Sequence, residues 1–362
     1  MAEPFITELC ERVRGHAESG RALRIRGGGS KDFYGGEPRE AERLEMAAYS
    51  GIVAYEPKEL VLTVRAGTPL AEVERVLEGE RQMLPFEPPH FDRTPLGDGA
   101  SGRATIGGVV ASGLSGPRRP YAGAVRDFVL GARIVNGKGE DLAFGGRVIK
   151  NVAGYDVSRL MAGALGTLGI VTEISFKVLP QPATQTTLVF AMDEAEAIRQ
   201  ANRWAGQPLP ISATAWQDAT LRVRLSGAGA AVAAAKAKMG GDEDTAAAGY
   251  WRDLREQRLA FFAGDAPLWR VSVPQTTEPL FPGRAQLVEW GGGVRWMRGP
   301  ADAFEVRSTA ERAGGHATLF RGGDKSVGVF HPLQPALMKI HRRLKAAFDP
   351  AGILNPGRMY DF

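Results

Sequence analysis

The sequence contains very little cysteine and histidine. Its 362 residues include one cysteine, Cys10, and five histidines. A single thiol excludes an intramolecular disulfide and a cysteine-ligated zinc or iron–sulfur centre within this sequence. The histidines stand at no metal-ligand spacing, at His16, His90, His316, His331 and His341. We therefore expect a cytoplasmic protein from a reducing compartment, with no metal site.

The sequence also lacks a strong charge imbalance and a long apolar run. It has 45 lysines and arginines against 41 aspartates and glutamates, a net charge of +4. The basic residues are spread along the chain, whereas a nucleic-acid partner requires a basic patch. The most apolar stretch, residues 104–114, is far shorter than the roughly 18 residues of a membrane helix. We predict no nucleic-acid partner and no transmembrane segment.

Glycine, in contrast, is abundant and clustered. There are 46 glycines, and before residue 180 they separate short β-forming runs and helical stretches. Strands broken by glycine-rich turns indicate backbone loops that approach a ligand closely, and the mixture predicts the α+β class. The clusters lie at 27–29, 35–36, 97–102, 107–108, 113–116 and 163–169.

The pattern changes after residues 180–182, Pro-Gln-Pro. Hydrophobic periodicity there predicts strand, helix, strand, strand and helix, the order of a ferredoxin-like unit. A hairpin is expected around Gly291–Gly293, and a helix over 251–262. We detect no internal repeat. The five predicted elements of the unit are 186–191, 193–204, 211–216, 221–225 and 228–238.

The first glycine cluster follows a predicted strand, residues 22–26. Successive backbone N–H groups without side chains can converge on an anion, and Arg26, Ser30 and Lys31 add positive charge and a hydroxyl. This pattern suits a diphosphate. A flexible turn accounts for three glycines equally well.

Residues 97–102 satisfy the pattern G-x-G-x-x-G of dinucleotide-binding βαβ units. That fingerprint requires a preceding strand and a following helix. Prolines 88, 89 and 95 break any preceding strand, and Thr105-Ile106-Gly107-Gly108 follows in place of a helix. We therefore reject a nicotinamide cofactor here, and no phosphate-binding G-x-x-x-x-G-K-[ST] motif occurs.

Two further loops share this small-residue character. Residues 105–116 alternate small and apolar side chains, so their backbone can lie flat against a planar ligand, or they can form a tightly packed helix start. Arg118 and Arg119 follow directly, and their charge favours an anionic ligand. The other loop runs through 150–156 and 163–172. Four such loops in one half of the chain favour one extended dinucleotide that crosses all of them.

At these residues the sequence resembles the FAD-binding flavoproteins of the PCMH type, also called vanillyl-alcohol-oxidase-like. The resemblance implies an α+β fold with a two-part FAD-binding domain (1–180), a ferredoxin-like cap that holds the substrate (181–330) and a C-terminal segment (331–362) that returns to the FAD domain. The matching segments are IRGGGSKDFYGG (25–36), ATIGGVVASGLSG (104–116), KNVAGYDVSRLMAGALGTLGIVTE (150–173) and FDPAGILNPGRM (348–359).

The resemblance also implies which residues hold FAD. The first cluster would hold the pyrophosphate, the second and third loops would follow the flavin and adenosine, and Asn355 with Gly357 would return towards the flavin. The implied FAD-binding residues are Arg26, Gly27, Gly28, Gly29, Ser30, Lys31, Pro88, Thr105, Ile106, Gly107, Gly108, Ser112, Gly113, Ser115, Gly163, Gly166, Thr167, Gly169, Ile170, Val171 and Asn355.

Two departures from the family pattern change these expectations. Some relatives bind FAD covalently through a histidine that corresponds to Ser30, so we expect non-covalent FAD. Many relatives that act on D-2-hydroxy acids carry a metal motif ending in D-G-N-x-H, which this sequence lacks. Without that motif the substrate carboxylate and hydroxyl lose their expected anchor.

Within the family the sequence is similar to the smaller FAD-binding subunit of bacterial glycolate oxidase. This implies oxidation of glycolate, or a related D-2-hydroxy acid such as D-lactate, to the 2-oxo acid. Electrons would pass from FAD to partner subunits, namely a second FAD subunit and an iron–sulfur subunit, with peripheral attachment at the inner membrane through the complex. A stand-alone dehydrogenase and a non-catalytic scaffold subunit are the alternatives.

No residue is assigned as the catalytic base. The cap offers several aromatic and basic side chains, of which Arg321, His316 and Trp296 are the named catalytic candidates; Arg321 would bind a carboxylate through its planar fork. The alternative is that the tryptophans belong to the core and the arginines to the surface. The full set is Trp290, Arg295, Trp296, Arg298, His316, Arg321 and Lys325.

Overall fold

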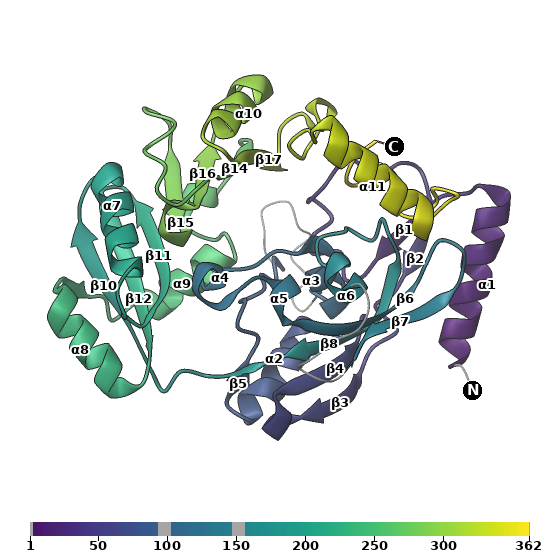
Figure 1. Cartoon of the computed structure of the whole chain (residues 1–362), viewed down its shortest axis with the longest axis horizontal. Coiled ribbons are helices and arrows are strands. Elements are labelled where there is room, and N and C mark those ends of the chain that lie inside the picture. Colours follow the sequence, from purple (N-terminus) through teal and green to yellow (C-terminus); the bar gives the residue numbers. More distant parts are fainter. Residues whose placement is uncertain (1–2, 93–102, 147–155, 362) are drawn as a thin grey trace.

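The computed structural model describes residues 3–92, 103–146 and 156–361, which form two sheet-containing parts (Figure 1). The first part is built on a five-stranded sheet of order β3-β4-β8-β6-β7, in which all neighbours are antiparallel. Its strands are β3 (Ile52–Glu56), β4 (Val61–Arg65), β6 (Val129–Val135), β7 (Asp141–Gly145) and β8 (Ile170–Lys177).

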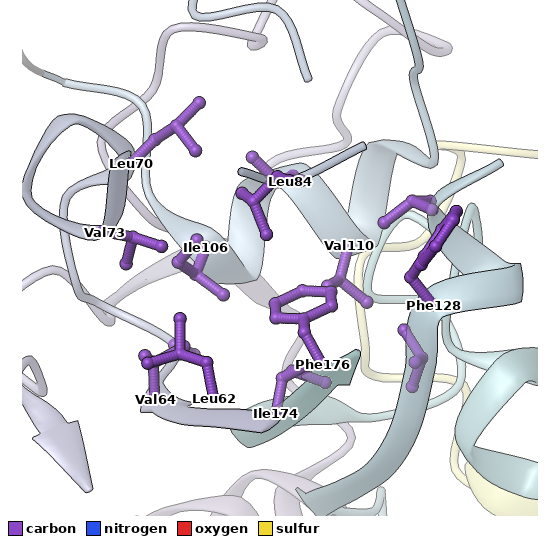
Figure 2. Packing of buried hydrophobic residues seen from close by; sticks show 14 of the residues in the cluster. Leu62, Val64, Leu70, Val73, Leu84, Ile106, Val110, Phe128, Ile174 and Phe176 are labelled. Atoms are coloured by element: carbon purple, nitrogen blue, oxygen red, sulfur yellow. The ribbon is translucent and has the colours of Figure 1, made fainter. Parts of the chain in front are cut away.

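Helices cover one face of this sheet (Figure 2). Leu62 and Val64 of β4 and Phe176 of β8 meet Ile106 and Val110 of α3 (Ile106–Ser112), and all five are fully buried. Burying each such side chain stabilises the fold by about 1.5–3 kcal/mol. Helix α3 therefore presents its branched residues to the sheet and leaves its small residues on the opposite face. Helices α2 (Leu70–Gly79), α5 (Val125–Phe128) and α6 (Val157–Leu160) complete this layer.

The two ends of the chain meet beside this sheet. The sequence predicts a short amphipathic helix at the N-terminus with Ile6, Leu9, Cys10 and Val13 on one face. Helix α1 (Pro4–Ser19) buries these four residues and packs on the parallel pair β1 (Leu23–Arg26) and β2 (Glu42–Glu45). Leu354 forms a bridge to Leu23, so the C-terminal segment lies against β1. Helix α11 (Pro335–Phe348) leads into that segment. A small pair, β5 (Gln82–Met83) and β9 (Leu179–Pro180), ends the first part.

The second part is an eight-stranded sheet of order β13-β10-β12-β11-β15-β16-β14-β17 (Figure 1). The predicted ferredoxin-like unit forms one half of it: β10, α7, β11, β12, α8 and β13 in chain order, arranged β13-β10-β12-β11. Its bounds are β10 (Thr184–Ala191), α7 (Glu194–Ala205), β11 (Ile211–Gln217), β12 (Thr220–Gly227), α8 (Gly229–Met239) and β13 (Asp242–Glu243).

The other half repeats this topology. Strands β14, β15, β16 and β17 follow the same order in space, with helix α10 before the last strand; residues 273–285, all described, replace the first helix. The two units join edge to edge where β11 pairs with β15. The sequence analysis detected no repeat, so this structural repeat corrects it. The bounds are β14 (Leu268–Ser272), β15 (Gln286–Glu289), β16 (Val294–Arg298), α10 (Ala303–Arg312) and β17 (His316–Arg321).

Two predicted helices are shorter in the structure. The helix expected over 251–262 is α9 (Ala247–Arg255) followed by the 3-10 turn η2 (Ala260–Phe262), because Gln257 takes a positive φ of 53°. The sequence also predicts a helix over 155–162, of which α6 is the helical part among the described residues. The remaining helical segments are η1 (Pro57–Glu59), α4 (Arg119–Ala122), η3 (Trp290–Gly292) and η4 (Lys325–Val327). Among the described residues no helix is long and apolar enough to cross a membrane.

Candidate active site

The predicted glycine loops converge on one cavity of about 110 Å³, which we call the cradle. The loop after β1 forms one wall, the small-residue face of α3 a second, and residues 165–171 with the C-terminal segment the rest. Most of the predicted FAD-binding residues line it. These are Arg26, Gly27, Gly28, Gly29, Ser30, Lys31, Thr105, Gly107, Gly108, Ser112, Gly166, Gly169, Val171 and Asn355.

The loop after β1 presents free backbone donors to the cradle. Within the described chain, the N–H groups of residues 27–31 donate to no protein acceptor. Arg26 pairs with Asp32 at 2.9 Å, and the Lys31 ammonium lies 3.3 Å from the Ser30 hydroxyl. Free N–H groups beside a guanidinium and an ammonium suit the two phosphates of a dinucleotide.

The glycines of the cradle are required for different reasons. A Cβ on Gly28 would lie 1.4 Å from the carbonyl oxygen of Arg103, and one on Gly27 would lie 2.3 Å from the Thr105 hydroxyl. These two glycines are required for packing within the protein. A Cβ on Gly108 would meet the Thr105 hydroxyl at 3.4 Å and nothing closer, so Gly108 keeps the cavity open.

Asn355 closes the cradle from the far end of the chain. Its side-chain oxygen accepts a hydrogen bond from the backbone N–H of Ile25 at 2.8 Å, and its amide nitrogen donates to the carbonyl of Leu165 at 2.7 Å. Asn355 and Leu165 both have positive φ, at 44° and 52°. Three segments distant in sequence are thus fixed by one side chain.

A second cavity of about 260 Å³ adjoins the cradle, and Ser112 lines both. We call it the cap cavity, because one wall comes from the first part and the other from β14–β17. The first part contributes Tyr34, Arg119 and residues 112–117, among others. The eight-stranded sheet contributes Arg270, Glu289, Trp290, Trp296 and Phe320.

Glu289 is the acidic residue of the cap cavity. It is buried, and the indole N–H of Trp296 donates to its Oε2 at 2.6 Å. Burial raises the pKa of Glu289 to about 7, although the Trp296 hydrogen bond and the positive charge of Arg270 act in the opposite direction. A carboxyl with this pKa can accept and release a proton near neutral pH.

The comparisons with known proteins agree with this geometry. Residues 6–145 match the FAD binding domain family, and residues 329–359 match the C-terminal domain of FAD linked oxidases. The chain is 46% identical over 353 residues to the glycolate oxidase subunit GlcE of Escherichia coli, covering 97% of this chain and 96% of that protein. The chain belongs to the FAD-linked oxidase family.

Other proteins are similar to this FAD-linked oxidase at lower sequence identity. The glycolate oxidase subunit GlcD of Bacillus subtilis is 33% identical over 41% of this chain and 30% of its own length. The structure of p-cresol methylhydroxylase superposes with a TM-score of 0.71 at 17% identity, covering 98% of this chain and 87% of that one. The 4-ethylphenol oxidase of Gulosibacter chungangensis gives 0.69 at 14%, covering 98% and 87%. The predicted PCMH-type α+β fold is therefore confirmed.

FAD is the cofactor of this FAD-linked oxidase, and the protein is an FAD-dependent oxidoreductase. The cradle fits the diphosphate of FAD, because its N–H groups at 27–31 lack protein acceptors and Lys31 adds positive charge. When bound, FAD supplies the site with a two-electron acceptor.

We expect Lys31 to make FAD binding by this FAD-linked oxidase depend on pH. Burial lowers the pKa of Lys31 to about 8, against the opposing charges of Glu256 and Asp92. A diphosphate beside the ammonium raises that pKa, so FAD binding should take up a proton above pH 8 and weaken as the pH rises. Calorimetry at about pH 9 in buffers of different ionisation enthalpy measures this uptake. A Lys31→Arg variant stays charged and should lose the uptake; equal uptake in both proteins would contradict the assignment.

The remaining predicted residues divide between the cap cavity and its surroundings. Gly113, Ser115, Gly163 and Trp296 line the cap cavity. Pro89 lines it in place of the predicted Pro88. The predicted residues that line neither cavity are Pro88, Ile106, Thr167 and Ile170. Residues 97–102 and 150–155 of the glycine motifs lie outside the described residues.

Two of the three catalytic candidates lie away from both cavities. Arg321 donates to the carbonyl of Phe262 at 2.8 Å, and His316 is exposed at the start of β17. Arg295 is buried in an ion pair with Glu194 at 3.0 Å, and Lys325 donates to the carbonyl of Phe33. Trp290 lines the cap cavity, and Arg298 does not.

Sequence reasoning missed Tyr34, Arg270 and Glu289. Each stands in an ordinary strand or loop pattern, so no local signal distinguishes it. Arg119 was noted as a charge next to the third loop, and the structure separates it from its neighbour. Arg118 binds Glu87, whereas Arg119 faces the cap cavity.

Proposed function

We propose that this FAD-linked oxidase is the FAD-carrying subunit of a glycolate oxidase assembly. It would oxidise glycolate, or a related D-2-hydroxy acid such as D-lactate, to the 2-oxo acid. The observation that carries the proposal is the 46% identity to GlcE across nearly the full length of both chains. The cap cavity supports it, because a small space with a proton-accepting carboxyl adjoins the cradle.

The oxidation removes a hydride and a proton from the substrate. Bound FAD would supply the acceptor for the hydride of the α-carbon and its two electrons, and the hydroxyl proton would pass to the Glu289 carboxylate. The carbon–oxygen bond becomes the carbonyl of the 2-oxo acid, so atoms and charges balance. Trp296 holds Glu289 in place through its indole N–H, and the buried setting keeps competing water away from the carboxyl.

We further propose the division of the chain that this chemistry needs. Residues 1–180 hold FAD, residues 181–330 form the cap over the substrate, and residues 331–362 return to close the cradle. Electrons then leave to partner subunits, a second FAD subunit and an iron–sulfur subunit, on the cytoplasmic side and at the inner membrane through the complex. That one relative is named a subunit supports an assembly.

Anaerobic reduction of the bound FAD tests this function. The FAD-loaded chain, alone and co-purified with its partner subunits, is mixed with glycolate or D-lactate, and loss of the flavin absorbance near 450 nm is followed (roughly where oxidised flavins absorb). We expect bleaching in the assembly. Bleaching of the chain alone would favour the stand-alone dehydrogenase. Bleaching in neither preparation, with FAD bound, would favour a scaffold and refute the proposed oxidation.

The attachment of FAD gives a further prediction. Ser30 lies in the cradle, at the position that carries the covalent histidine in some relatives, and a serine hydroxyl forms no such link. We expect acid precipitation of the holoprotein to leave the yellow colour in the supernatant. Colour retained in the pellet would contradict non-covalent binding. A Ser30→Ala protein, which should also release its FAD, is the matched control.

A further inference from the structure

We propose that Arg119 and Arg270, which both lie against the Trp290 indole in the cap cavity, form a binding site for the carboxylate of a small 2-hydroxy or 2-oxo acid. The inference rests on the proposed function and adds the residues that would recognise the substrate. The guanidinium carbons of Arg119 and Arg270 lie 4.5 and 4.9 Å from the centre of the Trp290 ring.

The first argument is the missing partner of Arg270. Among the described residues neither the Arg270 nor the Arg119 guanidinium forms an ion pair or a hydrogen bond, although the backbone of both residues is hydrogen-bonded. Other buried arginines of the same sheet are paired: Arg295 with Glu194 at 3.0 Å, and Arg224 with Glu87 at 2.9 Å. Burial lowers the pKa of Arg270, so its charge is held at a cost that a bound anion would offset. An unpaired guanidinium that lines a cavity is complementary to an anion from solution.

The second argument is the charge balance of the cap cavity. Arg119, Arg126 and Arg270 line it, and none of the three forms an ion pair among the described residues; Glu289, whose charge acts on Arg270 at longer range, is the acid among the described lining residues. Arg255, which also lines it, is occupied by Glu256 at 2.8 Å. The cavity therefore carries an excess of positive charge, which favours an acid over a neutral alcohol.

The backbone of Trp290 adopts a conformation that is rare for a bulky residue. This residue has a positive φ of 59°, an unfavourable conformation for a bulky side chain. The turn is held by hydrogen bonds on both sides: Gln275 donates to the Trp290 carbonyl at 2.9 Å, and the N–H of Gly291 donates to the Thr214 hydroxyl at 2.7 Å. Strained residues of this kind persist where the surrounding structure enforces a particular side-chain position. Here the enforced position places the indole within 5 Å of both guanidinium carbons, at 4.5 and 4.9 Å from its ring centre.

These observations define the ligand. A guanidinium binds a carboxylate through two parallel hydrogen bonds, and two guanidiniums that repel each other are stabilised by one shared anion. The indole face supports the two cations, and the aromatic rings of Trp296 and Phe320 leave room for a short carbon chain. The cavity volume of about 260 Å³ suits a small acid.

Calorimetric titration of the FAD-loaded protein with oxalate tests the site without turnover. Oxalate carries the carboxylates of a two-carbon acid and cannot donate a hydride, and oxamide is its neutral counterpart. We expect oxalate to bind and oxamide to fail. Arg270→Met and Arg119→Met should each weaken oxalate binding at least about tenfold, the loss of one charge-assisted hydrogen-bond pair. Arg312→Met, which removes an exposed arginine of α10, should leave it unchanged.

Equal oxalate affinity in Arg270→Met and in the unmodified protein would overturn the site. Methionine keeps the apolar stem of the side chain, so Arg270→Met should remain folded and retain FAD. Arg270→Lys is the second variant: it keeps the charge but loses the planar fork, and we expect an intermediate affinity. If Arg270→Met or Arg270→Lys loses FAD, the oxalate titration of the other variant tests the site, because both replace the same guanidinium.

The outcomes also separate this inference from the proposed function. Oxalate binding that depends on Arg270, with no reduction of FAD by glycolate, would leave the anion site standing and refute the oxidation. Reduction of FAD by glycolate with the same half-saturating concentration in Arg270→Met would refute the anion site and leave the oxidation standing.

Discussion

Replacing Gly108 by leucine should weaken FAD binding about a hundredfold while the protein stays folded. A side chain at this position points into the cradle, where its Cβ meets the Thr105 hydroxyl at 3.4 Å and no closer atom. Leucine would occupy much of a cavity of about 110 Å³. Forcing FAD past it should cost about 3 kcal/mol, or about a hundredfold in affinity. The flavin absorbance retained after desalting measures the loss.

The stability of the Gly108→Leu protein separates this effect from misfolding. Glycine in a helix is less stable than leucine by roughly 0.5–1 kcal/mol, so the FAD-free variant should unfold at the same or a higher urea concentration than FAD-free wild type. Gly15→Leu in α1 is the matched control, because a Cβ there meets nothing within 4 Å and the site is remote from the cradle. A Gly108→Leu protein that retains full FAD would refute the placement of the cofactor. Gly28→Val cannot serve this purpose, since its Cβ would strike the Arg103 carbonyl and unfold the loop.

Replacing Glu289 by glutamine should remove the reduction of FAD by substrate and leave FAD binding intact. General-base catalysis contributes about 10²- to 10⁴-fold, so the rate of anaerobic bleaching should fall by that factor. In the unmodified protein the rate should fall about tenfold for each pH unit below about 7, where the carboxyl becomes protonated. The Glu289→Gln protein should lose this pH dependence. An unchanged pH profile would remove Glu289 from the reaction.

The same substitution should stabilise the FAD-free protein. The folded-state pKa of Glu289, about 7, lies above its ordinary value of 4.5, so the fold favours the protonated form. Ionisation of Glu289 therefore lowers stability as the pH rises from 4.5 to 7, by about 3 kcal/mol in total. The charged or titratable groups around it are Arg270, Glu87 and Tyr250, with the Trp296 N–H as donor. Urea unfolding at pH 5 and at pH 8 measures the difference: Glu289→Gln should gain stability over wild type at pH 8 and little at pH 5.

The cradle was predictable from the sequence because its information is local. Glycine clusters next to strands indicate backbone that approaches a ligand, and Gly27–Gly29, Gly107–Gly108 and Asn355 all line the same cavity. The resemblance placed these loops in order along the chain. Their individual functions still required the structure, since Gly28 and Gly108 look alike in sequence and differ in what a side chain would meet.

The cap was predictable in its first unit and not in its second. Strands and helices of the first unit follow regular periodicity, whereas residues 273–285 replace a helix in the second and hide the repeat. Arg270 and Glu289 are ordinary strand residues in one dimension. In the structure Arg270 has a guanidinium without an ion pair, and Glu289 has a buried carboxyl. Both properties arise only because the fold brings β14 and β15 against the loops of the first part. The catalytic candidates Arg321 and His316 were chosen for their chemical type and line neither cavity. Chemical type alone does not determine whether a side chain reaches a cavity.

The bond between Asn355 and Ile25 spans 330 residues, and it determines when the protein can acquire its cofactor during synthesis. The loop after β1 leaves the ribosome early, but Asn355, which fixes it against residue 165, is translated 330 residues after Ile25. A nascent chain therefore has the loop after β1 without the hydrogen bonds of Asn355, and it should bind FAD weakly. Premature termination would yield polypeptides with a nearly intact FAD-binding domain that carry no flavin. Stable FAD binding would in this sense report that translation has passed residue 355.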